Sequence, residues 1–186
     1  VERTPHKMES LKACKTLPVS PVNMRRFFIT LINKEIRAAK AKKPASIILK
    51  LNSLVDTVLI TKLYEAAQAG VEVKMVIRGI CCAYTDQKSF KNHMTAISII
   101  DEYLEHARVF VFHNAGKPKV FISSADWMVR NLDHRVETAC PVNDTEIQNE
   151  LIDILNIQLA ESVKGRILDN EQSNAYVHHP GSKARV

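Results

Sequence analysis

No hydrophobic run in the sequence approaches the roughly 20 residues needed to cross a membrane. The first residues, VERTPHKMES, also lack the apolar segment of a signal peptide. These absences favour a cytoplasmic protein and leave open a peripheral association with a membrane. The sequence contains no internal repeat and no low-complexity block.

Cysteines are few and their spacing fits no metal site. Four are present, without a CxxC pair and without His/Cys ligand spacing: Cys14, Cys81, Cys82 and Cys140. Because adjacent cysteines rarely bridge each other, we expect a reduced, cytosolic protein rather than a disulfide scaffold. Cys81 and Cys82 are expected to pack as small apolar residues.

Aromatic residues make up only 6% of the chain, and most stand at positions that predict a core. A nucleic-acid-binding module would normally interleave aromatics with basic residues or carry a basic recognition helix. The net charge of +6 nevertheless suggests a polyanionic partner. Charge alone does not distinguish nucleic acid, nucleotide, polyphosphate and lipid headgroup. A basic polyanion-binding module therefore remains an alternative, and no specific nucleic acid is expected.

The 186 residues fit one domain with a sizeable core. Val1 is not an initiator methionine and GSKARV ends without a closing element, so we expect a domain of a longer protein. Residues 1–17, near several prolines, are expected to be the linker or tail of a preceding domain. The domain itself would span residues 18–186.

Hydrophobic periodicity predicts alternating helices and strands. The predicted helices are 23–43, 56–70 and 144–163, begun at Asn23, Asp56 and Asp144, and the predicted strands are 46–52, 71–79, 108–112, 119–123 and 135–142. Residues 96–106 are expected to mix a short strand with a short helix. The segment 46–79 is a βαβ pattern with parallel strands, and 108–123 is a hairpin. The predicted fold class is α/β, a single domain with a mixed β-sheet flanked by α-helices.

Arg78 ends a mostly apolar strand, KMVIR, and Gly79 follows it. In open α/β sheets, ligands bind outside the carboxyl ends of the parallel strands, where Asn52 and Ser53 end the neighbouring strand. A guanidinium at this edge can clamp phosphate through its planar fork. The alternative is a surface arginine paired with a loop acid.

His106 stands just before a predicted strand, two residues from Arg108. Alternation along a strand would point both side chains to one face. A histidine can shuttle protons or pair with phosphate near neutral pH. The alternative is a histidine at a helix end beside a structural arginine.

The stretch VFISSADWMVRNLDHRVE, read with His106-x-Arg108, resembles a degenerate half of the phospholipase D superfamily motif. That motif is H-x-K-x4-D, then G-S-x-N, then a late acid, here Glu137. The family residue is replaced at four positions: Arg108, His113, Ser123 and Asp126. These departures argue against a phospholipase-D-type phosphodiesterase, which remains an alternative, and they are compatible with a phosphate-binding pocket. We expect Asp126 to hydrogen-bond the Ser123–Ser124 turn and Trp127 to pack in the core.

Longer blocks carry a closer resemblance: IILKLNSLVD, YEAAQAGVEVKMVIRGICC, IDEYLEHARVFVFHNAG, VFISSADWMVRNLDHRVE and DNEQSNAYV. From about Pro18 to the end, the chain resembles the C-terminal catalytic, phospholipase-D-like domain of the bacterial type 1 polyphosphate kinases. That family reversibly transfers the γ-phosphate of ATP to inorganic polyphosphate. The resemblance therefore implies a phosphotransferase whose ligands are ATP, ADP and polyphosphate, with Mg²⁺ accompanying ATP.

The resemblance also implies roles for single residues. It makes Arg78 and His106 catalytic contacts of ATP and phosphate, in a phosphate-binding wall that includes Arg108, Ser123, Ser124 and Arg130. The family's phosphohistidine, its magnesium-associated arginines and its adenine-stacking tyrosine lie in the preceding domains, and their motifs are missing from this sequence. We therefore expect no metal ligand in this chain, an inactive isolated domain, and as partners the preceding domains in a homo-oligomer.

Overall fold

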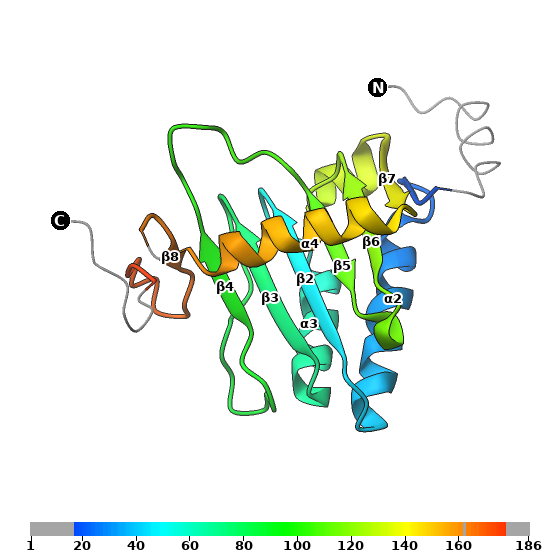
Figure 1. Ribbon diagram of the computed structural model, residues 1–186, viewed down its shortest axis with the longest axis horizontal. Helices are drawn as coiled ribbons and strands as arrows, with labels where there is room; N and C mark the ends of the chain where they lie inside the picture. Colours follow the sequence, from blue (N-terminus) through cyan, green and yellow to red (C-terminus); the bar gives the residue numbers. More distant parts are fainter. Residues whose placement is uncertain (1–16, 162, 178–186) are drawn as a thin grey trace.

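The computed structural model describes residues 17–161 and 163–177 of the chain. The strands of these residues form one mixed sheet in the order β1-β7-β6-β5-β2-β3-β4-β8 (Figure 1). The strands are β1 (Val19–Ser20), β2 (Ser46–Leu51), β3 (Glu72–Ile77), β4 (Thr95–Ser98), β5 (Val109–Phe112), β6 (Lys119–Ser123), β7 (Glu137–Val142) and β8 (Arg166–Ile167). The helices are α2 (Met24–Lys40), α3 (Thr57–Ala69) and α4 (Thr145–Leu159), with short helical turns η1 (Asn114–Gly116) and η2 (Arg130–His134). The predicted α/β domain with a mixed sheet is confirmed.

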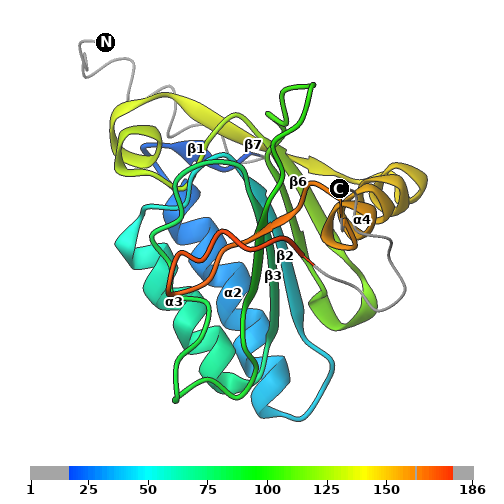
Figure 2. The same cartoon turned by 90° about the vertical axis from the view of Figure 1, so that its left-hand side faces the viewer.

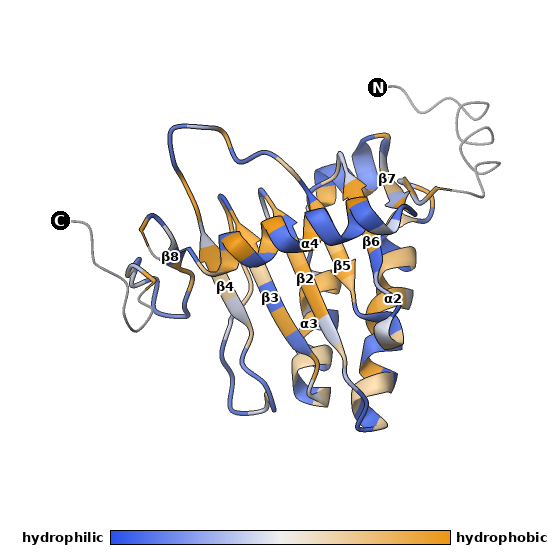
Figure 3. Cartoon of the chain, in the orientation of Figure 1, coloured by the Kyte–Doolittle hydropathy of each residue, from blue (hydrophilic) through white to orange (hydrophobic). Residues whose placement is uncertain are grey.

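The sheet is covered on both faces, with α2 and α3 on one side and α4 on the other (Figure 2). Strand alternation produces this arrangement, because successive side chains point to opposite faces. On β2, Ile47 and Leu49 join the large core beneath α2 and α3, whereas Ile48 packs with the smaller cluster beneath α4. The central strands are accordingly hydrophobic along most of their length (Figure 3).

Strand directions bring several chain segments to one edge of the sheet. β2 pairs with β3 and β3 with β4 in parallel, while β5 runs antiparallel to β2 and β6 antiparallel to β5. The predicted βαβ unit and hairpin are therefore both confirmed. The ends of β2, β3, β4 and β6 thus lie beside the starts of β5 and β7. We call this the polar edge, made of residues 52–53, 78–79, 99–108, 123–126 and 137; it is uppermost in Figure 1.

Helix boundaries follow the predicted caps in two of three cases. Asp56 accepts a hydrogen bond from the Leu59 backbone N–H at 3.0 Å, and Asp144 caps α4 in the same way. Gly70 ends α3 in the left-handed conformation, φ 99°, which glycine adopts without a Cβ penalty. The side chain of Asn23 makes no bond to α2 and accepts from the Val19 backbone N–H at 2.7 Å.

Three expectations about length and type are wrong. α2 ends at Lys40, short of the predicted residue 43. α4 ends at Leu159, short of the predicted residue 163. The predicted short helix within 96–106 is not formed. Residues 99–108 follow β4 as a loop without helix or strand. Tyr103 and Leu104 are 79% and 72% exposed, so a helix there would have no apolar face to bury.

The expected linker 1–17 lies outside the described residues except for its last residue. In residues 17–161 and 163–177, no helix is long and apolar enough to cross a membrane.

Candidate functional site

Arg78 and the end of β2 meet at the polar edge, as predicted. The Gly79 N–H donates to the Asn52 carbonyl at 2.8 Å. A Cβ on Gly79 would lie only 3.1 Å from that carbonyl oxygen, so glycine permits the close approach. The loop after β3 therefore lies directly against the loop after β2, and Arg78 belongs to that junction.

The backbone of Arg78 is fixed on two sides. Its N–H donates to the Leu51 carbonyl at 3.1 Å, and its carbonyl accepts from Ser98 Oγ at 3.0 Å. Among the described residues, no carboxylate forms an ion pair with its half-buried guanidinium. The alternative of a surface arginine paired with a loop acid thus has no acid to support it in this part of the chain.

Asp126 is the centre of a buried polar cluster. Its Oδ1 accepts from the backbone N–H groups of Asn52 at 2.7 Å and Ser53 at 3.1 Å, and its Oδ2 accepts from Arg108 Nη2 at 2.9 Å. We call these four residues the Asp126 clamp. Burial alone would raise the pKa of Asp126, but the bonds from Arg108 and Asn52 hold it below its ordinary value. The carboxylate is therefore kept charged.

The expectation that Asp126 bonds the Ser123–Ser124 turn is wrong. The chain after β6 folds back over the end of β2, where the Trp127 carbonyl accepts from the N–H groups of Val55 and Asp56 at 2.8 Å. This return places Asp126 over backbone N–H groups at the end of β2 that need an acceptor. Trp127 itself is fully buried, as predicted.

Arg108 is committed to protein partners. Besides binding Asp126, its Nη1 donates to the His106 carbonyl at 3.2 Å, and only 13% of its side chain is exposed. His106 lies in the loop before β5 with its side chain exposed. The alternation of a strand therefore does not determine where the side chains of His106 and Arg108 point. Arg108 thus connects the Asp126 clamp to the backbone of His106.

Ser123 and Ser124 are also engaged. Ser123 Oγ donates to the Thr138 carbonyl at 2.9 Å and accepts from the Ala125 N–H at 3.0 Å. The Ser124 hydroxyl donates to the Glu137 carboxylate. Both serines hold the start of β7 against the end of β6, and their hydroxyl protons point to protein acceptors.

Arg130 occupies the first position of η2, and its side chain is exposed. The next residue, Asn131, is buried and donates from Nδ2 to Glu137 Oε1 at 2.9 Å. Glu137 therefore anchors η2 as well as Ser124, and η2 presents Arg130 outward.

Three residues that the sequence analysis did not single out form a closed polar triangle near His106. Lys50 Nζ lies 2.6 Å from Glu105 Oε2 and 3.0 Å from Gln158 Oε1, and Gln158 Nε2 lies 2.9 Å from Glu105 Oε2. The hydrogen bond from Lys50 holds the pKa of Glu105 below its ordinary value. The available signal was a lysine inside the apolar strand SIILKL.

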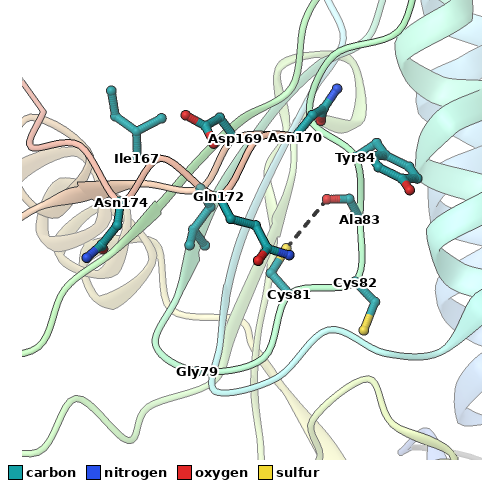
Figure 4. A pocket seen from close by; sticks show the side chains of 11 residues that line it. Gly79, Cys81, Cys82, Ala83, Tyr84, Ile167, Asp169, Asn170, Gln172 and Asn174 are labelled. Atoms are coloured by element: carbon teal, nitrogen blue, oxygen red, sulfur yellow. Dashed lines mark hydrogen bonds between the residues drawn. The ribbon is translucent and has the colours of Figure 1, made fainter.

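A cavity of about 460 Å³ lies beside the polar edge, between the loop 79–84 and the segment 167–174 (Figure 4). Asn170 joins its walls: its Oδ1 accepts from the Thr85 N–H at 2.8 Å and its Nδ2 donates to the Asp86 carbonyl at 2.6 Å. Cys81 and Cys82 line the cavity, and Cys82 is exposed, so its expected apolar packing is wrong. Arg78 and His106 are not among its lining residues.

The sequence model described as "Polyphosphate kinase C-terminal domain 2" matches residues 17–186. The chain is 50% identical over 170 residues to a polyphosphate kinase of Vibrio cholerae, covering 91% of this chain and 24% of that protein. It is 44% identical over 170 residues to the polyphosphate kinase of Escherichia coli K12, covering 91% of this chain and 25% of that protein. The chain thus spans about a quarter of the curated relatives it matches.

Solved structures of a polyphosphate kinase and of a phospholipase D family member are also similar to the chain. The crystal structure of a polyphosphate kinase from Porphyromonas gingivalis superposes with a TM-score of 0.87 at 45% identity, covering 91% of this chain and 26% of that one. Nuc of Salmonella typhimurium, a phospholipase D family member, superposes with a TM-score of 0.57 at 17% identity, covering 83% and 97%. The likeness to Nuc concerns the fold alone, and it confirms the predicted phospholipase-D-like architecture.

Proposed function

The chain belongs to the polyphosphate kinase family as its C-terminal domain 2, and from this premise we propose that it supplies part of a site for reversible phosphoryl transfer from ATP to inorganic polyphosphate. The observation that carries the proposal is Arg78, whose guanidinium stands at the carboxyl end of a parallel strand without a carboxylate partner among the described residues. Phosphoryl transfer needs positioning and charge stabilisation more than covalent chemistry from each wall of the site.

Arg78 neutralises charge on the β- and γ-phosphates of ATP in this proposal. Its fixed backbone and its guanidinium, which has no carboxylate partner in residues 17–161 and 163–177, support the role, because a planar fork binds two phosphate oxygens at once. His106 hydrogen-bonds the transferring phosphoryl group or protonates the leaving oxygen. Its exposed side chain on the same edge supports this assignment.

The remaining predicted phosphate contacts form two groups: Arg130, whose side chain is exposed, and three residues whose side chains already bind protein groups. Arg130 is exposed on η2 and adds positive charge to the wall. Ser123 and Ser124 donate to protein acceptors, and Arg108 is held by Asp126. We propose that these three shape and brace the wall rather than carry the phosphate charge.

The preceding domains supply the phosphohistidine and hold Mg²⁺ in this proposal. In the ranges that the structure describes, no three or more His, Cys, Asp or Glu side chains come together to form a metal site. We therefore assign to this domain no step that passes through a metal. Mg²⁺ would arrive with ATP.

A phospholipase-D-type phosphodiesterase has less support. The motif lysine would have to be free to bind the substrate phosphate, and Arg108 at that position is largely buried and paired with Asp126. His113, at the motif aspartate position, uses Nδ1 to accept from the Gly116 N–H at 3.3 Å in a turn.

The isolated chain is expected to make no polyphosphate, since the family's phosphohistidine motif is missing from its sequence. The test incubates the purified 186-residue chain with ATP, magnesium and a polyphosphate primer. Product above a no-protein control would contradict the assignment of only part of a site to this chain.

In a full-length polyphosphate kinase that carries this domain, Arg78→Ala and His106→Ala should each lower kcat/KM by about 10²-fold or more. Arg78→Lys should restore activity only in part, because a point charge does not reproduce the bidentate fork. Arg37→Ala, at an exposed position on α2, is the matched control and should leave activity unchanged. With far-UV circular dichroism unaltered, near-normal activity of either alanine variant would remove that residue from the site.

A further inference from the structure

Lys50 is a charged side chain inside the sheet. It lies on β2, the central strand between β5 and β3, and only 5% of its side chain is exposed. Ile48, two residues earlier on the same face, packs with Val109, Val111 and Leu155 in the apolar cluster beneath α4. An apolar residue at position 50 would extend that cluster without desolvating a charge, so packing alone does not explain a lysine.

The charge of Lys50 is matched by one carboxylate, and that carboxylate belongs to the residue before His106. Glu105 Oε2 accepts from Lys50 Nζ at 2.6 Å and from Gln158 Nε2 at 2.9 Å. Gln158 also accepts from Lys50 at 3.0 Å, so α4 and β2 hold Glu105 together. Side chains from β2 and α4 thereby fix the position of Glu105 in the loop 99–108.

After its first residue, little apolar packing holds that loop. Residues 99–108 form no helix or strand, and Ile99 is buried beside β4, but Ile100, Tyr103 and Leu104 are 71%, 79% and 72% exposed. The second fixed point follows at once, where the His106 carbonyl accepts from Arg108 in the Asp126 clamp. The position of His106 is therefore fixed by the bonds of the neighbouring Glu105 side chain and by the bond from Arg108 to its own carbonyl.

We propose that Lys50, Glu105 and Gln158 are positioning residues that hold the loop so that the His106 imidazole faces the transferring phosphoryl group. This inference rests on the proposed function of His106. A displacement of about 1 Å at a reacting group can cost on the order of 10²-fold in rate, and one tether adjacent to the histidine is well placed to prevent it. Lys50 itself stays beneath α4 and touches no substrate.

The test uses the full-length enzyme and two genetic backgrounds. Glu105→Ala should lower kcat by about 10-fold or more while KM for ATP changes by less than about twofold, because orientation and not binding is lost. Glu105→Gln, which keeps the shape and an acceptor oxygen, should recover part of the loss. Lys50→Met should lower kcat like Glu105→Ala, and the double variant should be no worse than either single one.

The same substitutions in a His106→Ala background should change kcat by less than about twofold, since the histidine they position is gone. The control is the ion pair Lys62–Glu65 on α3, also 2.6 Å long, where Lys62→Met and Glu65→Ala should leave kcat unchanged in both backgrounds. An equal loss from Glu105→Ala in both backgrounds, or no loss in either, would overturn the positioning role and leave the proposed function standing. Near-normal activity of His106→Ala alone would remove His106 from the proposed site and would overturn the positioning role with it.

Discussion

Arg78 and His106 stand at the same edge of the sheet but are held there by different means. Arg78 follows β3 directly, and its backbone is bonded to the ends of β2 and β4. His106 lies in a loop with little buried surface and is fixed through Glu105 and Arg108. The packing of a strand in the core fixes the position of the residue that follows it, whereas the position of a loop residue depends on a few polar contacts. Substitutions should therefore act through the fold in the first region and through local geometry in the second.

Asp126→Ala should have the largest effect on stability, because it removes the central acceptor of the Asp126 clamp. It leaves the N–H groups of Asn52 and Ser53 without their acceptor and the largely buried Arg108 without its carboxylate. Removing one partner of a buried pair costs about 3–5 kcal/mol. Urea-induced unfolding of the 186-residue chain measures it.

Asp126→Asn is the matched variant and should cost less, since its amide oxygen still accepts from the two backbone groups. Glu65→Ala, which breaks an ion pair on α3, should cost at most about 1 kcal/mol. A loss from Asp126→Ala no larger than that of Glu65→Ala would show that the strand ends do not depend on the clamp.

Leu104→Ser should have the smallest effect, because this loop leucine is 72% exposed. A substitution at such a position usually changes the free energy of unfolding by less than about 0.5 kcal/mol. Leu49→Ala, at a fully buried position on β2, should cost about 2–5 kcal/mol in the same urea experiment. Comparable losses from the two would mean that the loop is packed as firmly as the sheet.

Local patterns predicted most of the fold. The βαβ unit, the hairpin and the caps at Asp56 and Asp144 depend on residues close in sequence, and each is present. The meeting of Arg78 with Asn52 was also predictable, because the carboxyl ends of adjacent parallel strands share an edge.

Contacts between distant segments were not predictable in this way. Asp126 binds Asn52 and Ser53, more than 70 positions earlier, only because the chain after β6 turns back over β2. Likewise, Glu105 and Gln158 meet Lys50 only after α4 packs on the sheet. The residues 101–106 have a helix-like pattern, but that pattern finds no partner surface, and tertiary structure overrides it.

The central claim is that Arg78 lies in a built phosphate site and does not simply add to a diffuse positive charge. The most direct measurement is the affinity of the full-length enzyme for long polyphosphate at several salt concentrations. By analogy with DNA, log K should fall roughly linearly with log salt, with a slope set by the number of phosphates neutralised. Arg78→Ala should lower that slope by about one unit. Lys42→Ala, at an exposed position before β2 and at the opposite end of the sheet, should leave it unchanged. Equal slopes for the wild type and both variants would contradict the claim.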